Sequence, residues 1–116
     1  MIYLKIEKSI LLFFILDAPK VSIPQSANGN VLVNESSTLT IHCAVDANPK
    51  ADYIRWRKMG STATVSGSSL VLLNAQRDQA GVYVCEAANT LAPSGDAIIT
   101  GKGNSTVNVI VQCMYS

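Results

Sequence analysis

Apolar and polar side chains alternate strictly along residues 37–45. One face of this segment carries Leu39, Ile41, Cys43 and Val45. The other face carries Thr38, Thr40, His42 and Ala44. A period of two with β-branched residues predicts a β-strand that is buried on one side.

The same period recurs in segments farther along the chain. In residues 53–58, Ile54 and Trp56 share one face, and Arg55 and Arg57 share the other. The remaining apolar sets are Leu70 and Leu72, then Tyr83, Cys85 and Ala87, and then Val107, Val109 and Val111. Two weaker segments, residues 20–23 and 31–33, come earlier. We expect a strand at each place.

Turn signals separate these segments. They are Asn28-Gly29-Asn30, Asn48-Pro49, Gly60-Ser61, Ser66-Gly67-Ser68 and Pro93-Ser94-Gly95. The sequence shows no sustained apolar period of 3.6 residues. Many short strands joined by turns predict an all-β sandwich or barrel and exclude a helical protein.

The first 16 residues differ from the rest of the chain. The apolar run of residues 10–16 is far shorter than the about 20 residues of a membrane-spanning helix. With Lys5 and Lys8 before it, the run resembles the apolar region of a secretory signal, although Leu16 and Pro19 make a poor cleavage site after Ala18. A second interpretation is a gene-model artefact, since a translated pyrimidine-rich intron end would encode such residues. Under both interpretations we place residues 1–17 outside the folded domain.

The composition of the chain reduces the number of possible functions. The chain has 116 residues, a formal net charge of +1 and only 15% charged residues, so a basic nucleic-acid-binding face is excluded. One His and three Cys leave little material for a metal site, and we expect neither metal nor cofactor.

Catalytic chemistry is not expected either. His42 lies on the polar face of its strand, and no second His exists for a catalytic triad. The glycine-flanked Lys102 lacks the spacing of a phosphate-binding loop, and we interpret residues 101–103 as an ordinary loop. Arg55, Arg57 and Lys58 form a small basic patch, either a solvated sheet face or the rim of a protein interface. We therefore expect a binding module, not an enzyme.

The cysteines and aromatics form the most specific pattern in the chain. Cys43 and Cys85 are 42 positions apart, and both lie on apolar strand faces. Trp56 lies 13 positions after the first, and Tyr83 lies two before the second. This pattern, with CAVDAN-P, YIRWRKMG and SSLVLLNAQRDQAGVYVCEAAN around it, resembles the immunoglobulin superfamily. The match is to I-set or constant-like domains of multi-domain adhesion receptors similar to nephrin, echinoid and sidestep.

The resemblance implies a Greek-key β-sandwich of two antiparallel sheets over residues 18–112, with residues 113–116 as a C-terminal edge or linker. It also implies a Cys43–Cys85 disulfide between the sheets, Trp56 packed on the sulfurs, and a corner pinned by the Tyr83 hydroxyl. Leu72 joins these residues in the expected core. The chain departs from the family at Gln79, where an Asp is usual, so the family's ion pair at that position is not expected here.

Two N-glycosylation sequons begin at Asn34 and Asn104, both at expected turns or strand edges. With the disulfide framework they favour an extracellular, cell-surface setting. Cys113 is the third cysteine and follows the last strand in the inward parity of Val111. We interpret it as a linker residue, or else as an intermolecular thiol.

The expected function is protein–protein recognition in cell adhesion, through a homophilic contact or another immunoglobulin-superfamily receptor. The candidate interface is the outward face of residues 53–58, 81–89 and 105–111, whose members include Arg55, Arg57, Val82, Val84 and Glu86. Apolar contact with charge at the rim suits a modest interface. The alternatives are a structural spacer in an array of such domains, and a secreted binding protein with a single domain of this kind.

Overall fold

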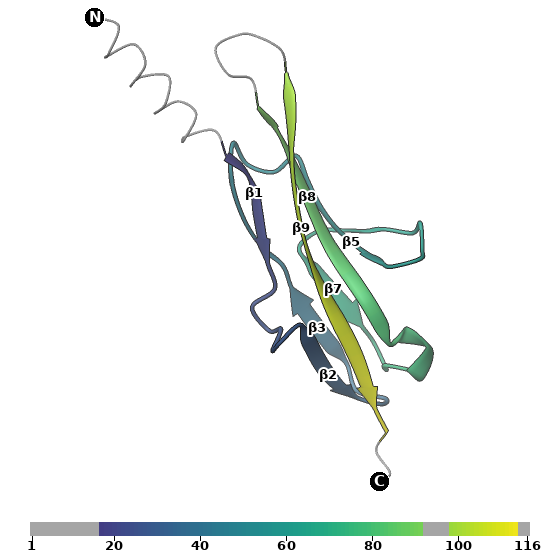
Figure 1. The fold of residues 1–116 in the computed structure, drawn as a ribbon. Helices are drawn as coiled ribbons and strands as arrows, with labels where there is room; N and C mark the ends of the chain where they lie inside the picture. Colours follow the sequence, from purple (N-terminus) through teal and green to yellow (C-terminus); the bar gives the residue numbers. More distant parts are fainter. Residues whose placement is uncertain (1–16, 92–97, 114–116) are drawn as a thin grey trace, which may run out of the picture.

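The computed structural model describes residues 17–91 and 98–113, which form strands and one short 3₁₀ turn (Figure 1). The strands are β1 (Asp17–Ser22), β2 (Asn30–Asn34), β3 (Leu39–His42), β4 (Ala44–Asn48), β5 (Tyr53–Lys58), β6 (Val65–Ser66), β7 (Ser69–Leu72), β8 (Gly81–Leu91) and β9 (Ile99–Gln112). The 3₁₀ turn η1 (Arg77–Gln79) precedes β8. The predictions for residues 1–16, the Pro93-Ser94-Gly95 turn and residues 114–116 lie outside the described residues.

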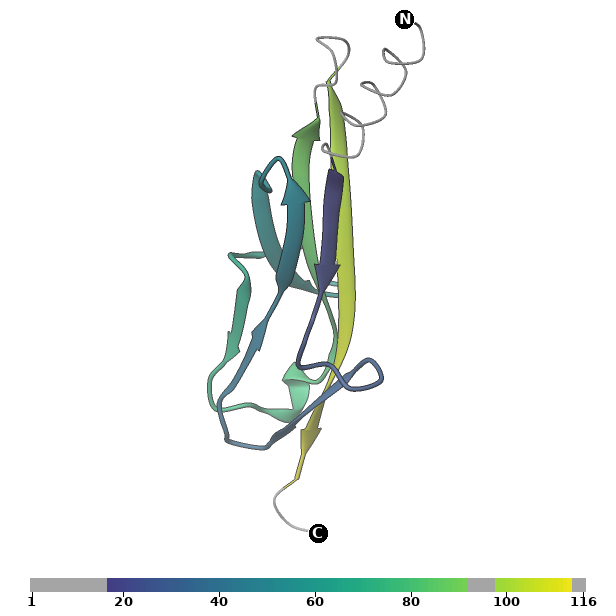
Figure 2. The same ribbon diagram turned by 90° about the vertical axis from the view of Figure 1, so that its left-hand side faces the viewer.

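The strands form two layers. One layer is a five-stranded sheet in the order β2-β9-β8-β5-β6, and the other consists of the pairs β1-β4 and β3-β7. Figure 2 shows the layers from the side, with β9 and β7 on opposite sides of the molecule. The predicted all-β sandwich is confirmed. Every strand pair is antiparallel except β2 with β9, which run parallel.

The strand expected at residues 37–45 is divided at Cys43. Its first part, β3, pairs with β7, and its second part, β4, pairs with β1. The inward residues keep their alternation across the break, because Ile41 and Cys43 are both buried. A single chain segment therefore serves two neighbouring pairs in the same layer.

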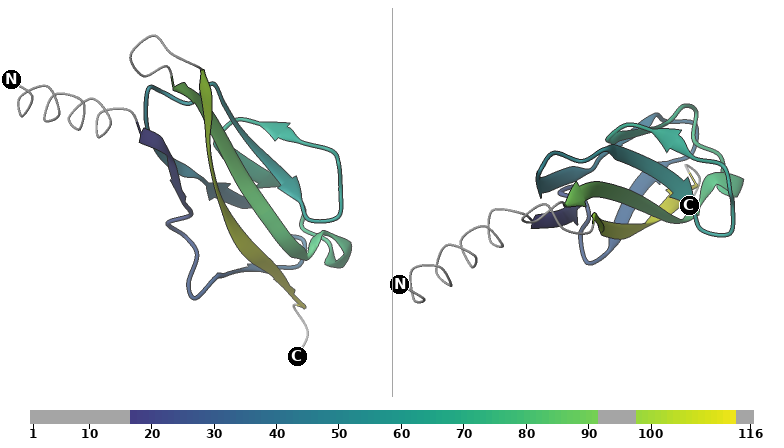
Figure 3. Two further views of the ribbon diagram at one scale, coloured as in Figure 1. Left: turned by 45° about the horizontal axis from the view of Figure 1, so that its top comes forward. Right: turned by 90° about the horizontal axis from the view of Figure 1, so that it is seen from above.

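Strand β9 is the longest element and holds the five-stranded sheet together. It pairs with β8 from Gly81↔Val109 to Leu91↔Ile99, so that the two strands run side by side along the molecule (Figure 3). Its lower part also pairs with β2. The upper end of this β8–β9 hairpin is the pair Leu91↔Ile99.

The expectation of a loop at residues 101–103 is wrong, because this segment lies inside β9. Here β1 packs directly onto β9. A Cβ on Gly101 would stand 3.0 Å from the Cα of Ala18, and a Cβ on Gly103 would collide with the carbonyl group of Pro19. The two glycines are therefore required by the close approach of a neighbouring strand.

The core lies between the two layers around the Cys43–Cys85 disulfide, whose Cα atoms are 6.4 Å apart. Trp56 is fully buried, and its Nε1 donates a hydrogen bond to the carbonyl oxygen of Ser68 at 3.0 Å. Leu72 is also buried. The Tyr83 hydroxyl donates to the carbonyl oxygen of Gln79 at 2.6 Å, which ties β8 to the turn before it. A rigid core of this kind fixes the outward side chains of the five-stranded sheet.

Candidate functional site

The outer face of the five-stranded sheet is built from the side chains of β2, β9, β8 and β5 that point away from the core. Because side chains alternate along a strand, directly opposed residues on neighbouring strands form rows across this face. From the upper end in Figure 1 downward, the rows are Tyr53–Ala88–Lys102, Arg55–Glu86–Asn104, Arg57–Val84–Thr106, Met59–Val82–Asn108–Asn30, and Ile110–Leu32. Arg55, Arg57, Val82, Val84 and Glu86, the predicted interface residues, all belong to this face.

Glu86 is the electrostatic centre of the upper rows. Its carboxylate accepts a charge-assisted hydrogen bond from Nε of Arg57 and forms a second ion pair with Arg55 at 3.4 Å. The hydrogen bond from Arg57 lowers the pKa of Glu86, and Arg55 adds to the effect. The Arg55 guanidinium also lies over the Tyr53 ring, 4.4 Å from its centroid, in a cation–π contact. The upper rows are thus polar and internally paired.

The basic patch expected from Arg55, Arg57 and Lys58 is not formed. Both arginines are paired with the single carboxylate of Glu86, which offsets one of their two positive charges. Lys58 lies on the other side of β5, where its Nζ donates to the carbonyl oxygen of Asp78 at 2.7 Å. The sequence places three cations within four positions, but strand alternation and cross-strand pairing separate them.

Val84 is wrongly predicted as an exposed contact residue. Only 4% of it is exposed, whereas Val82, two residues earlier on the same strand, is 40% exposed. Arg57 lies directly opposite Val84 and contacts both the Glu86 carboxylate and, at 3.9 Å, the sulfur of Met59. We attribute the burial of Val84 to this long side chain, because directly opposed side chains on neighbouring strands pack together.

The lower rows of the outer face carry four exposed apolar side chains beside Asn108 and Asn30. We call Met59, Val82, Ile110 and Leu32 the apolar rows; they are 52%, 40%, 37% and 54% exposed. Leu32 and Ile110 are directly opposed on β2 and β9, and the Met59 backbone N–H bonds to the Val82 carbonyl oxygen. Strand parity places Ile110 outward in the sequence, but nothing in the sequence shows that β2 lies beside β9 and brings Leu32 to the same face.

The layer formed by β3 and β7 presents a different surface. His42 is exposed there, and its Nδ1 is 2.9 Å from the Ser69 hydroxyl. Val71 and Leu73, which are not among the predicted contact residues, are 49% and 71% exposed. The alternation of Val71 with the buried Leu70 and Leu72 was the signal that could have placed it outward.

The two sequons have different settings. Asn34 is exposed at the end of β2, as expected for a strand edge. Asn104 is exposed too, but it lies inside β9 opposite Glu86, not at a turn. The glycines at 101 and 103 suggest a loop in the sequence. In the structure they lie inside β9 and allow β1 to pack against it.

Cys113 lies just beyond β9 at the lower end and is exposed, contrary to the inward position that its parity with Val111 predicts. Alternation no longer applies to it because β9 ends at Gln112. Its Sγ is 3.4 Å from the Arg77 guanidinium, which also forms an ion pair with Glu35 at 2.9 Å.

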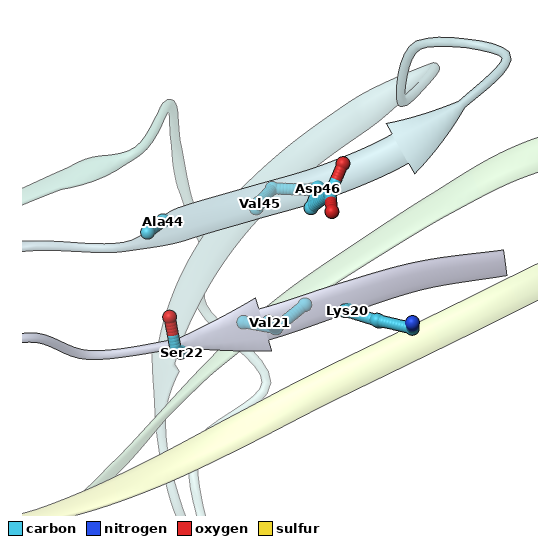
Figure 4. Close-up of a pocket in the computed structure, with 6 residues that line it drawn as sticks. All are labelled: Lys20, Val21, Ser22, Ala44, Val45 and Asp46. Carbon is cyan, nitrogen blue, oxygen red and sulfur yellow. The ribbon is translucent and has the colours of Figure 1, made fainter. Parts of the chain in front are cut away.

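The molecule has shallow hollows but no cavity suited to a small ligand among those we find in the described part. One of about 230 Å³ runs along β1 and β4, where Val21 is paired with Val45 and Lys20 with Asp46 in its lining (Figure 4). A second, of about 260 Å³, lies between β4 and β5 around Val45 and Ile54. Ligand pockets are usually about 300–1,000 Å³ and enclosed.

Among residues 17–91 and 98–113, no three His, Cys, Asp or Glu side chains gather closely enough to hold a metal ion. The same residues contain no helix with the length and apolar character needed to cross a membrane.

The chain is similar in sequence to a cell adhesion molecule and to a contactin. It is 31% identical over 80 residues to cell adhesion molecule 4 of Rattus norvegicus, covering 66% of this chain and 21% of that protein. It is 39% identical over 80 residues to contactin-1 of Homo sapiens, covering 64% of this chain and 7% of that protein. The chain thus spans about a fifth or less of the length of these relatives.

Solved structures share the fold. The N-terminal four Ig domains of Dscam1 isoform 4.44 match with a TM-score of 0.65 at 14% identity, covering 84% of this chain and 21% of that one. The complex of Dpr11 IG1 with DIP-gamma IG+IG2 matches with a TM-score of 0.59 at 24% identity, covering 82% and 48%.

The family model described as immunoglobulin domain matches residues 18–89, which span β1 to most of β8 and include the disulfide, Trp56 and Tyr83. The sandwich, the buried tryptophan on the disulfide and the tyrosine corner agree with this match. The chain belongs to the immunoglobulin domain family.

Proposed function

We propose that this chain is a non-enzymatic, extracellular recognition domain of a cell-surface receptor, with residues 18–112 as the domain. Its work is cell adhesion, and its partner is a protein: a second copy of the receptor or another member of the immunoglobulin superfamily. The partner binds the outer face of the five-stranded sheet, with the apolar rows at the centre of the contact and the Arg57–Glu86 pair at its rim.

The exposure of the apolar rows carries this proposal. Val82, Ile110 and Leu32 come from three different strands, yet they lie together on one face with Met59 beside them. Apolar side chains that gather on a sheet face lose contact with water when a partner covers them, and this drives association. Arg57, the charged residue beside the apolar rows, is already paired with Glu86, so a partner that covers this part of the rim does not bury an isolated arginine.

The relatives give independent support. Cell adhesion molecule 4 is an adhesion protein by name, and the disulfide is typical of oxidising, extracellular environments. The structure of Dpr11 bound to DIP-gamma is a complex between two proteins with Ig domains.

The test uses cells that display the receptor carrying this chain, measured for aggregation with each other and with cells that display other immunoglobulin-superfamily receptors. Val82→Glu is expected to weaken aggregation strongly, because it places a charge among the apolar rows. The matched control is Val71→Glu, since Val71 is similarly exposed but lies on β7 in the other layer. Both variants should keep the thermal midpoint of the parent.

Aggregation that survives Val82→Glu and Ile110→Glu would overturn the proposed binding face. A structural spacer would then be the better explanation. Loss of aggregation with Val71→Glu alone would move the contact to the β3–β7 layer.

A further inference from the structure

Both sequons of the chain lie on the outer face of the five-stranded sheet. Asn104 belongs to the row Arg55–Glu86–Asn104 of the upper half, and its amide side chain is exposed beside the ion pairs. The threonine of this sequon, Thr106, lies on the same face in the next row.

Asn34 marks the opposite end of the face. It lies two residues after Leu32 on β2, so alternation directs both side chains outward. It is exposed and pairs with Gln112, the last residue of β9. The apolar rows thus lie between the two sequons, while no sequon occurs on β1, β3, β4 or β7.

We propose that N-linked glycans on Asn34 and Asn104 frame the apolar rows and confine a protein partner to the surface between them. During N-glycosylation the side-chain amide nitrogen of each asparagine bonds to the anomeric carbon of a lipid-linked oligosaccharide. The lipid pyrophosphate leaves, and the amide loses one proton. The inference rests on the proposed extracellular recognition function, since only a chain in the secretory pathway meets that sugar donor.

The two glycans limit the area of the sheet face that a partner can cover. Eight residues of β9 separate the level of Asn104 from that of Gln112. At about 3.3 Å per residue this is about 26 Å, and the rows in between, which contain two to four strands and on average three, are about 14 Å wide at about 4.8 Å per strand. The framed surface is then roughly 400 Å², about half of what one partner contributes to a standard interface. The glycans therefore hold the contact in the small, transient class.

Occupancy is the first part of the test. The full chain, directed into the secretory pathway of cultured animal cells, is treated with peptide N-glycosidase in H₂¹⁸O, which converts each glycosylated asparagine to ¹⁸O-labelled aspartate. Peptide mass spectrometry is expected to find the label at both Asn34 and Asn104. Ser105→Ala keeps the Asn-x-Thr sequon and should keep the label, whereas Thr106→Ala should lose it. Absence of label at either asparagine in the parent overturns the proposal.

Shielding is the second part, and it needs no partner. In a Cys113→Ser background, Lys102→Cys reports on the upper half of the outer face and Val82→Cys on the apolar rows. Labelling by a bulky maleimide is compared before and after removal of the glycans. We expect several-fold protection by the glycan at Lys102→Cys and none at Val82→Cys.

Adding Asn104→Gln should abolish the protection of Lys102→Cys, and adding Asn34→Gln should leave it. Tyr53→Cys, in the same row, is a second reporter if Lys102→Cys does not fold. Equal labelling at all positions, or protection of Val82→Cys as well, would overturn the framing. Neither result depends on adhesion, so a failure of the proposed function leaves this measurement intact.

Discussion

The carbonyl group of Pro19 occupies the place where a side chain on Gly103 would begin. The contact joins β1 in one layer to β9 in the other, at the end of the sandwich where the two layers come together. A similar contact lies two residues earlier in β9, where a side chain on Gly101 would meet Ala18 and the side-chain oxygen of Asn89. Asn89 is fully buried, and its Nδ2 donates to the carbonyl oxygens of Asp17 at 2.8 Å and Pro49 at 2.9 Å. The position of β1 is therefore set by backbone contacts more than by apolar side chains.

Replacing Gly103 by Ala is expected to destabilise the domain. The new methyl group must displace β1, and overpacking of this kind costs about 1–3 kcal/mol. Urea unfolding at equilibrium measures the loss. Lys102→Ala, on the exposed side of the same strand, is the control and should change the free energy of unfolding by less than about 0.5 kcal/mol. A Gly103→Ala variant as stable as the control would contradict the close packing of β1 on β9.

Replacing Trp56 by Ala removes the largest side chain of the core. The free energy of unfolding is expected to fall by about 3–5 kcal/mol, because the indole is fully buried in the core with the disulfide and its removal leaves a cavity. Chemical denaturation followed by far-ultraviolet circular dichroism gives the value, since the variant lacks the tryptophan fluorescence. A loss below about 1 kcal/mol would show that the indole is outside the core.

Val82 and Val84 should respond differently to truncation. Val84→Ala is expected to cost about 1.5 kcal/mol, because it removes buried methyl groups beneath Arg57. Val82→Ala should cost less than about 0.5 kcal/mol, since Val82 is exposed. Paired urea melts compare the two variants, and equal losses would mean that Arg57 does not cover Val84 in solution.

Tyr83→Phe tests the corner before β8. The variant loses the hydrogen bond to the Gln79 carbonyl oxygen and should be less stable by about 1 kcal/mol. Burial raises the pKa of the Tyr83 phenol, and the charge of Asp78 adds to this. The raised pKa favours the neutral phenol in the folded state. The contribution of the neutral phenol to the stability of the fold is complete below the ordinary tyrosine pKa. It is lost as the pH rises through the pKa of Tyr83 in the folded state. Tyr83→Phe should therefore flatten the fall of the thermal midpoint at alkaline pH.

Glu86→Gln tests the ion pairs of the outer face. The hydrogen bond from Arg57 lowers the pKa of Glu86 in the folded state, so this stabilisation is complete above the ordinary carboxyl pKa of about 4.3. This stabilisation is lost as the pH falls through the pKa that Glu86 has in the folded state. Because the arginine side chains are 40% and 34% exposed, solvent limits the effect to about 1 kcal/mol or less.

The thermal midpoint measured from neutral pH into the acid range checks this. The parent should fall more steeply than Glu86→Gln below about pH 4. Parallel curves would show that Glu86 is not paired in solution.

The sequence predicted the layers and the centre of the core because these depend on local alternation. Cys43, Trp56, Tyr83 and Cys85 each follow a period of two within their own segments, and the structure buries all four. The spacing of the cysteines and the aromatics then matched a known pattern, and the Cys43–Cys85 disulfide is confirmed.

What the sequence missed depends on register between distant strands. Arg57 and Glu86 are 29 positions apart, so their pairing follows from how β5 aligns with β8 and not from either segment alone. The burial of Val84 has the same origin. Likewise, the glycines at 101 and 103 resemble a loop locally, and only the approach of β1 explains them.

Strand β9 also determines when this fold can be completed. It is synthesised after all the other described strands of the domain, yet it pairs with β2 and β8 and carries the glycines on which β1 rests. Until it emerges, β2 has no paired strand, β1 lacks the strand on which it packs, and one edge of β8 has no partner. A nascent chain that lacks β9 therefore exposes an apolar edge strand, which is a site for misassembly. For this domain, folding must follow the synthesis of its C-terminal strand, and a premature stop within β9 would leave a product for chaperones and not a smaller domain.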